Sequence, residues 1–210
     1  MAAGFFVVLE GPEGSGKTTL ARALAHTLQS RGIDPVMIRE PGGTPAAEVL
    51  RRELLDSDRP WTPEMELLYM VTARADVVTR VVRPALEGGR VVISDRFDLS
   101  TRAYQGAGRG VPLEPLEWVN RAATGGLRPD LTIILDLPPE EGVARLHRNQ
   151  RAQNRLDQES GEFHARVAQR YLEEHGPGIR HLDASVPVER LLEDAYGELR
   201  AARPDLIPPL

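Results

Sequence analysis

The sequence predicts an α/β fold in which helices cover both faces of a central parallel five-stranded sheet. Short apolar runs rich in β-branched residues alternate with longer stretches whose apolar residues recur at helical spacing. Such alternation is typical of a parallel sheet, because the helix between two parallel strands packs onto the sheet. The 210 residues suffice for one well-buried α/β domain and are too few for two of ordinary size. We therefore expect a single domain over residues 1–210.

The strands are expected in the short apolar runs, which in chain order are residues 5–9, 35–39, 91–94, 131–137 and 179–183. A first helix is expected to begin at or just inside the glycine-rich segment after the first strand, because Leu20, Leu24 and Leu28 recur at helical spacing. The proline-rich tail at 204–210 is expected to be frayed. The remaining predicted helices are residues 46–55, 63–86, 113–123, 139–148, 159–174 and 188–200.

Composition narrows the class of protein. A hydrophobic fraction of 41% and a charged fraction of 27% are ordinary for a soluble globular protein. A formal net charge of −5 argues against a general nucleic-acid binder but leaves room for a few local arginines that bind a small phosphorylated substrate. No cysteine is present, so no disulfide and no cysteine-held metal is expected. The N-terminal apolar run is too short for a signal or membrane helix, so we expect a soluble cytoplasmic enzyme.

The segment from Gly11 to Thr18 reads Gly-Pro-Glu-Gly-Ser-Gly-Lys-Thr, a phosphate-binding loop or P-loop. A strand is predicted before it and a helix after it, which is the context that separates a functional loop from an accidental match. Its glycines let successive backbone N–H groups point at one anion, and the helix N-terminus adds partial positive charge. We expect Lys17 to reach the β- and γ-phosphates and Thr18 to offer its hydroxyl to Mg²⁺. The predicted ATP ligands are Gly11, Pro12, Glu13, Gly14, Ser15, Gly16, Lys17, Thr18 and Thr19.

Asp95 and Arg96 follow the third predicted strand. In parallel sheets ligands bind at the carboxyl ends of the strands, so this position is a candidate site. The acid can hold Mg²⁺ together with Thr18, and the arginine can bind phosphate oxygens through two N–H groups. The alternative is a surface ion pair at a strand end, and the P-loop makes the functional interpretation the stronger one.

Residues 148–157 form an arginine-rich segment with almost no apolar content, and we expect an exposed lid there. Arg148, Arg151 and Arg155 can close over a transferring phosphoryl group. A solvated connection between two helices explains the same spacing equally well.

Two regions stay open on composition alone. Residues 100–110 mix small polar residues with glycines and are compatible with a loop or with the start of a helix. Arg74 lies within a predicted helix and is compatible with a surface residue or with a residue that binds a base.

In this order, these pieces resemble bacterial thymidylate kinases over nearly the whole chain. The P-loop is common to many families, whereas Ala-Tyr-Gln-Gly at 103–106, shortly after Asp95-Arg96, is specific. The resemblance implies a P-loop kinase fold with an arginine-rich lid, a homodimer, and transfer of the γ-phosphoryl group of ATP to dTMP with Mg²⁺. The matching segments are 10–19, 39–44, 95–96, Ser100, 103–106, 108–110, 129–132 and 154–159.

The resemblance implies which residues act on the phosphates. Lys17 and Arg96 are expected at the transferring group, and Arg51 near the acceptor phosphate. The bacterial class takes a catalytic arginine from the lid, and Arg155 matches that position best. Because the acceptor is already an anion at neutral pH, no general base is required, and catalysis has to come from positioning and charge neutralisation.

The resemblance also implies how the nucleoside is bound. Glu13 is expected to accept a hydrogen bond from the 3′-hydroxyl, and Tyr104 to crowd the 2′ position and so reject ribonucleotides. Arg74 is expected to donate to thymine, with Thr101 and Gln105 near the base edge. The implied dTMP ligands are Glu13, Arg39, Pro41, Arg51, Met70, Arg74, Arg96, Ser100, Thr101, Tyr104 and Gln105.

One position departs from the family. The phenylalanine that usually stacks on thymine is replaced by Met70, whose polarizable sulfur can still pack against a ring.

Two other functions are compatible with a P-loop: a kinase of another nucleoside monophosphate or of a nucleoside, and a nucleotide-driven regulator. The regulator is the weaker alternative, because a second arginine-rich phosphate site would be of little use to it.

Overall fold

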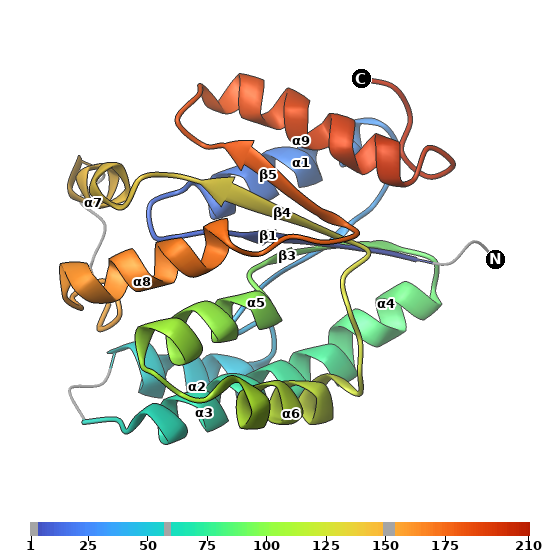
Figure 1. The fold of residues 1–210 in the computed structure, drawn as a ribbon. Coiled ribbons are helices and arrows are strands. Elements are labelled where there is room, and N and C mark those ends of the chain that lie inside the picture. The colour runs from blue at the N-terminus through green and yellow to red at the C-terminus, as the bar shows by residue number, and fades with distance from the viewer. Residues whose placement is uncertain (1–3, 57–59, 149–153) are drawn as a thin grey trace.

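The computed structural model describes residues 4–56, 60–148 and 154–210, and these form an α/β structure with a central sheet between helices (Figure 1). The sheet is parallel, with strand order β2-β3-β1-β4-β5. The predicted fold class is therefore confirmed. The strands are β1 Phe5–Glu10, β2 Val36–Arg39, β3 Val91–Asp95, β4 Leu131–Asp136 and β5 Ile179–Asp183.

The helices follow the predicted ranges closely. Residues 100–110, which the sequence left open, are helical as far as Gly108. Within the described ranges, no helix is long and apolar enough to cross a membrane. The helices are α1 Lys17–Ser30, α2 Pro45–Asp56, α3 Pro63–Val77, α4 Arg83–Glu87, α5 Asp98–Thr101, α6 Leu113–Thr124, α7 Pro139–Arg148, α8 Gly161–Leu172 and α9 Val188–Ala202, with π-helical segments η1 Val78–Val82 and η2 Arg102–Gly108.

The predicted helix at 63–86 is continuous in space but changes its hydrogen-bond register at η1, between α3 and α4. Pro84 lies in the first turn of α4 and has no N–H to donate to the preceding turn. A π-helical turn accommodates such a break in the usual ladder. We therefore attribute the change of register to Pro84.

The central strand β1 is buried at all six positions, as expected for a strand covered on both faces. Because successive side chains of a strand point to opposite faces, β1 contributes to two core clusters. Phe5, Val7 and Leu9 pack in the cluster that α1 and α9 cover. Phe6 and Val8 pack in the cluster with residues of α3, η1 and α4. Figure 1 shows α1 and α9 on one side of the sheet and α3 to α6 on the other.

The C-terminal tail corrects one expectation. The middle of residues 204–210 is packed onto the protein and not frayed: Ile207 is fully buried, and Tyr196 Oη donates to the carbonyl oxygen of Pro208 at 3.0 Å. Leu206 and Ile207 join the cluster under α1 and α9. The proline content suggested fraying, whereas the burial of Ile207 and the partial burial of Leu206 hold this part of the tail in place.

The sheet brings three chain segments together at one edge. β1 and β3 lie side by side, with Leu9 opposite Asp95, and β2 places Arg39 opposite the same residue. The segments that follow β1, β2 and β3 therefore start at neighbouring points, as the positions of the polar residues in the sequence predicted.

Candidate active site

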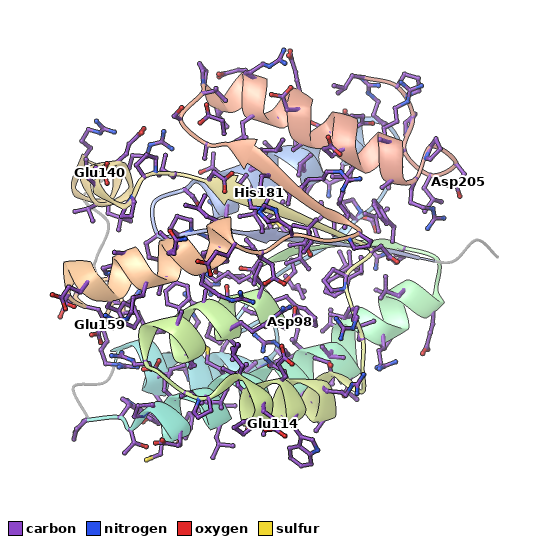
Figure 2. The ribbon with its side chains drawn as sticks, viewed as in Figure 1. Asp98, Glu114, Glu140, Glu159, His181 and Asp205 are labelled. Atoms are coloured by element: carbon purple, nitrogen blue, oxygen red, sulfur yellow. The ribbon has the colours of Figure 1, made fainter. Side chains whose placement is uncertain are left out.

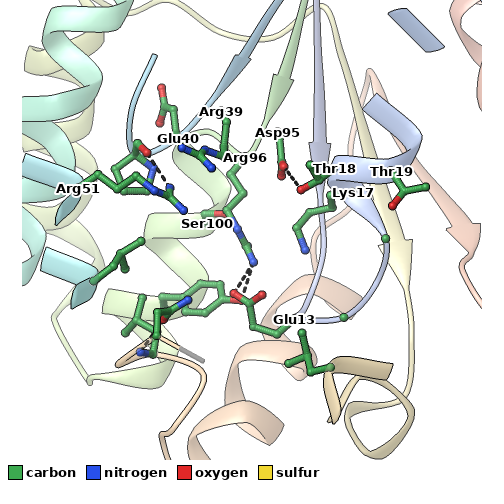
Figure 3. Close-up of a pocket in the computed structure, with 18 of the residues that line it drawn as sticks. Glu13, Lys17, Thr18, Thr19, Arg39, Glu40, Arg51, Asp95, Arg96 and Ser100 are labelled. Atoms are coloured by element: carbon green, nitrogen blue, oxygen red, sulfur yellow. Dashed lines mark hydrogen bonds and ion pairs between the residues drawn. The ribbon is translucent and has the colours of Figure 1, made fainter. Parts of the chain in front are cut away.

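A cavity of about 410 Å³ opens at the carboxyl ends of these three strands (Figure 3). Figure 3 shows Lys17, Thr18 and Thr19 on one side of it and Arg39, Glu40 and Arg51 on the other, with Asp95 and Arg96 between them. We call the first group, with the other lining residues Gly14, Gly16, Arg22, Arg145 and Leu146, the P-loop side. We call the second group, with the other lining residues Pro41, Leu55, Met70, Ser100, Tyr104, Asn154 and Leu156, the far side.

The P-loop has backbone conformations that glycine adopts readily and other residues rarely adopt. Gly11 and Gly14 have φ of +139° and +75°, where side chains are rarely accommodated. A Cβ atom at Gly14 would also lie 2.3 Å from the carbonyl oxygen of Gly142. α1 begins directly after the loop, and no side chain caps its N-terminus. The first N–H groups of the helix thus have no side-chain acceptor at the P-loop, where they can bind an anion.

Lys17 is the only lysine in the sequence, and the loop buries it at 5% exposure. Its ammonium donates to the carbonyl oxygens of Gly11 at 3.0 Å and Pro12 at 2.6 Å, and to Ser15 Oγ at 3.1 Å. Burial, together with the nearby Arg96 guanidinium, lowers the pKa of Lys17 to about 8. An anion bound in the loop would favour the charged ammonium, so phosphate and Lys17 stabilise each other.

Thr18 and Asp95 bring oxygen ligands together beside the loop. The Thr18 hydroxyl donates to Asp95 Oδ2, and both residues line the cavity. Hydroxyl and carboxylate oxygens are the hard ligands that Mg²⁺ prefers, with phosphate oxygens and water completing its shell. The donor set therefore fits the predicted metal.

Arg96 lies between the two sides of the cavity. Its φ of +78° is unusual for a residue with a side chain and costs on the order of 1–3 kcal/mol, which the surrounding contacts have to offset. The guanidinium also lies over the ring of Tyr104, 4.9 Å from its centre. Its hydrogen bonds run from Nη1 to Gly11 O (3.2 Å), Ser100 Oγ (3.1 Å) and Tyr171 Oη (3.2 Å), and from Nη2 to Glu13 Oε1 (2.6 Å) and Tyr104 Oη (3.1 Å).

Glu10 shares the hydrogen-bond partners Ser100 and Tyr171 with Arg96 and was not predicted as a site residue. It is fully buried, and burial raises the pKa of its carboxyl group, although Arg96 acts in the opposite direction. It accepts hydrogen bonds from the backbone of Phe97 (2.8 Å) and Ser100 (3.1 Å), from Ser100 Oγ (2.6 Å) and from Tyr171 Oη (3.0 Å). A glutamate that directly ends a buried apolar strand was the available signal.

The far side carries a second group of cations. Arg51 Nη1 donates to the carbonyl oxygen of Pro41 at 2.8 Å, which holds α2 to the segment after β2. Arg39 pairs loosely with Glu48 at 3.4 Å and keeps about half of its side chain exposed. Together with Arg96 these residues place three guanidinium groups across the cavity from the P-loop, and such groups can bind an anion (Figure 3).

Three predicted base ligands are absent from the lining of the cavity. Arg74 is 2% exposed, and it donates to Glu40 at 2.7 Å, to Thr101 at 2.9 Å and to the carbonyl oxygen of Phe97 at 2.8 Å, as well as to the side chain of Asn120. Gln105 donates to Glu66 at 2.7 Å. Arg74, Thr101 and Gln105 therefore lie in the protein layer behind the far side. Burial raises the pKa of Glu40 to about 7, although Arg74 acts in the opposite direction.

The two described arginines of the predicted lid, Arg148 and Arg155, do not line the cavity. Arg148 ends α7 and is exposed, and Arg151 lies outside the described residues. Arg155 does not line the cavity, because its side chain is directed to Glu66 and to the carbonyl oxygen of Leu54. The structure thus places Arg155 away from the cavity lining, whereas the sequence predicted it at the transferring group.

Two cavity-lining arginines were missed by sequence reasoning. Arg145 projects from α7 and pairs with Glu141 at 2.7 Å, and Arg22 lies on α1 shortly after the P-loop. Arg145 precedes Arg148 by three residues, so it shares a helix face with it. That spacing was the signal available in the sequence.

Two comparisons with known proteins identify the family of this chain. The family model described as thymidylate kinase matches residues 9–195, which include every residue that lines the cavity. A relative named thymidylate kinase, from Ectopseudomonas mendocina (strain ymp), is 44% identical over 208 residues, and the match covers 97% of each chain. The chain therefore belongs to the thymidylate kinase family.

Proposed function

We propose that the chain transfers the γ-phosphoryl group of ATP to dTMP, forming dTDP and ADP, in the supply of dTTP. One observation carries this proposal within the family. The P-loop and the group of Arg39, Arg51 and Arg96, each suited to bind an anion, face each other across a single cavity. A phosphoryl transfer between two phosphates needs this arrangement, because both polyanions have to be brought together and neutralised.

On the P-loop side, the backbone of residues 11–19 and Lys17 would hold the phosphates of ATP. Thr18 and Asp95 are the residues that would hold Mg²⁺, which neutralises phosphate charge when it is bound there. Arg145 lines this side and adds a cation near the transferred group. Arg148 and Arg151 stay predictions for the same role.

On the far side, Arg39, Arg51 and Arg96 would bind the acceptor phosphate, with Pro41 and Ser100 lining the same wall. Arg96 is oriented by Glu13 and Tyr104, so its N–H groups are fixed before the phosphate arrives. This preorganisation supports the proposed role of Arg96 as the residue that follows the transferring group.

The nucleoside would occupy the remaining far side. Tyr104 Oη donates to Glu13 Oε1 at 3.1 Å, so both groups proposed to contact the deoxyribose are already paired. Met70 lines the cavity where a base ring would pack. Arg74 makes four hydrogen bonds to described residues, and a guanidinium has five N–H groups, so one is left for a thymine carbonyl. Thr101 and Gln105 are proposed to lie behind the far side and to hold the residues that would contact the base.

The proposal includes a homodimer and a cytoplasmic location. α3 and α6 pack on each other through Leu67 and Leu116. Their outer surfaces expose large apolar side chains, among them Trp118 at 71% and Leu68 at 52%. Apolar exposure of this kind marks protein interfaces. Sedimentation should give a dimer that Trp118→Glu dissociates, and a wild-type monomer would remove the dimer from the proposal.

A coupled assay of ADP release tests the reaction. Mg-ATP would be offered with dTMP, dUMP, UMP, CMP, AMP and thymidine in parallel. Strong selectivity for dTMP is expected. Preference for another acceptor would retain the two-site mechanism but reject dTMP as the substrate, and ATP binding without any transfer would reject the kinase in favour of a regulator.

A further inference from the structure

Glu66, in the first turn of α3, is a buried carboxylate that the proposed reaction does not use. Its side chain is 1% exposed, which is unusual for a glutamate and requires partners. It accepts hydrogen bonds from Gln105 Nε2 at 2.7 Å and Arg155 Nη2 at 2.6 Å. Arg109 Nη2 forms a further ion pair with it at 3.1 Å. Glu66 therefore joins η2, α3 and the segment before α8.

Arg155 is attached to the protein at three points. Its backbone N–H donates to the carbonyl oxygen of Leu55 at 3.1 Å, and its Nε donates to that of Leu54 at 3.2 Å. Its Nη2 donates to Glu66. A guanidinium bound in this way links the end of α2 to the start of α3. These contacts are those of a structural anchor.

The neighbours of Arg155 form part of the wall of the cavity. Asn154 and Leu156 line the cavity on either side of it in the sequence. Leu156 belongs to the same apolar cluster as Leu55, Tyr104 and Met70, which line the far side. The anchored residue therefore lies between two residues of the cavity wall.

Charges in the cluster around Glu66 are balanced. Arg109 bridges Glu66 and Glu159, which Figure 2 shows near the start of α8. Two carboxylates thus face two guanidiniums, Arg109 and Arg155. Loss of either partner in the Glu66–Arg155 pair leaves one charge uncompensated in a largely buried place. We therefore expect either single substitution to disrupt the contact as fully as both together.

We propose that Glu66 and Arg155 form a positioning pair that fixes the wall of Asn154 and Leu156 for the acceptor nucleoside. Arg155 then acts through the shape of the far side and does not touch the transferred phosphoryl group. The inference rests on the proposed function, since it concerns the acceptor of that reaction.

Steady-state kinetics of Glu66→Gln, Arg155→Gln and the double variant test this proposal. The KM for dTMP is expected to rise about tenfold in each single variant and by no more in the double variant, because both changes release the same wall. The KM for ATP and kcat are expected to stay within about threefold of the wild type. A kcat loss of about 100-fold in Arg155→Gln, with kcat retained in Glu66→Gln, would overturn the proposal and make Arg155 a catalytic arginine.

Glu159→Gln is the matched control, because it removes a carboxylate from Arg109 but leaves the contact between Glu66 and Arg155. Its KM for dTMP is expected to stay within about twofold of the wild type. If Glu66→Gln does not fold, Arg155→Lys takes its place. A lysine keeps a cation for Glu66 but loses the bond to Leu54, so an intermediate KM with unchanged kcat is expected, whereas a large fall in kcat would contradict the proposal.

The same double-mutant cycle, measured by unfolding of the ligand-free protein, separates the two hypotheses. Non-additive destabilisation is expected from the pair whether or not dTMP is the substrate. Additive effects with normal dTMP kinetics would reject the positioning pair alone. Absence of dTMP turnover in the wild type would reject the proposed function alone.

Discussion

The two sides of the cavity are built in different ways. The P-loop side comes mainly from one stretch of chain, residues 11–19, and presents backbone N–H groups and a single lysine. The far side draws on residues between Arg39 and Leu156 and is supported from behind by a buried ion pair, Arg74 with Glu40 at 2.7 Å. Substitutions on the P-loop side should therefore lower activity and change stability little. Substitutions on the far side should lower both activity and stability.

The largest effect is expected from Lys17→Ala. Removal of the only cation inside the P-loop should lower kcat by about 1000-fold or more, because charge on the transferring group is no longer neutralised. The melting temperature should change little, since a buried ammonium is lost together with its desolvation cost. The measurements are ADP release and thermal unfolding. Arg180→Ala, which removes an exposed cation from a surface pair with Glu198, is the control and should leave kcat unchanged.

Arg96→Lys should lower kcat/KM for dTMP by about 100-fold and also lower the melting temperature. A lysine cannot reproduce the five contacts of the guanidinium, and without them the strained backbone at this position is no longer offset. Arg102→Lys, at a partly buried arginine outside the cavity, is the matched control. Near-normal kcat/KM in Arg96→Lys would show that a positive charge alone is needed at this position. It would contradict the view that this part of the site depends on the specific contacts of a guanidinium.

Glu10→Gln should reduce the free energy of unfolding by about 2–3 kcal/mol. The amide oxygen can still accept from the backbone of Phe97 and Ser100, but the NH₂ group would replace the oxygen that accepts from the hydroxyls of Ser100 and Tyr171. Urea titration measures the change, and Glu193→Gln in an exposed pair is the control, with an expected change below about 0.5 kcal/mol. A loss of activity without a loss of stability would mean that Glu10 contacts a substrate.

Met70→Phe should have the smallest effect. An aromatic ring at this position of the far side should keep or lower the KM for dTMP, because a ring stacks on a base at least as well as a thioether packs against it. Initial rates at varied dTMP measure the effect, with Met65→Phe on the exposed surface of α3 as the control. A large rise in KM would remove Met70 from the base site.

The sequence by itself determined the five-stranded sheet, the P-loop and the placement of Asp95 and Arg96 beside it. These features depend on residues that are close in the chain: an apolar run specifies a buried strand, and glycines at short spacing specify a loop. Parallel pairing then brings the strand ends together without further information.

Only the tertiary structure decided the partners of the long polar side chains. Arg74 lies behind the far side with Glu40, Arg155 is anchored on Glu66, and Arg145 reaches the cavity. Spacing along the chain assigns a residue to a helix face, but the direction of an arginine depends on which carboxylate packs opposite it. Such a carboxylate comes from a distant segment, and burial makes its pairing obligatory, so packing and not local pattern selects the residues that face the substrate.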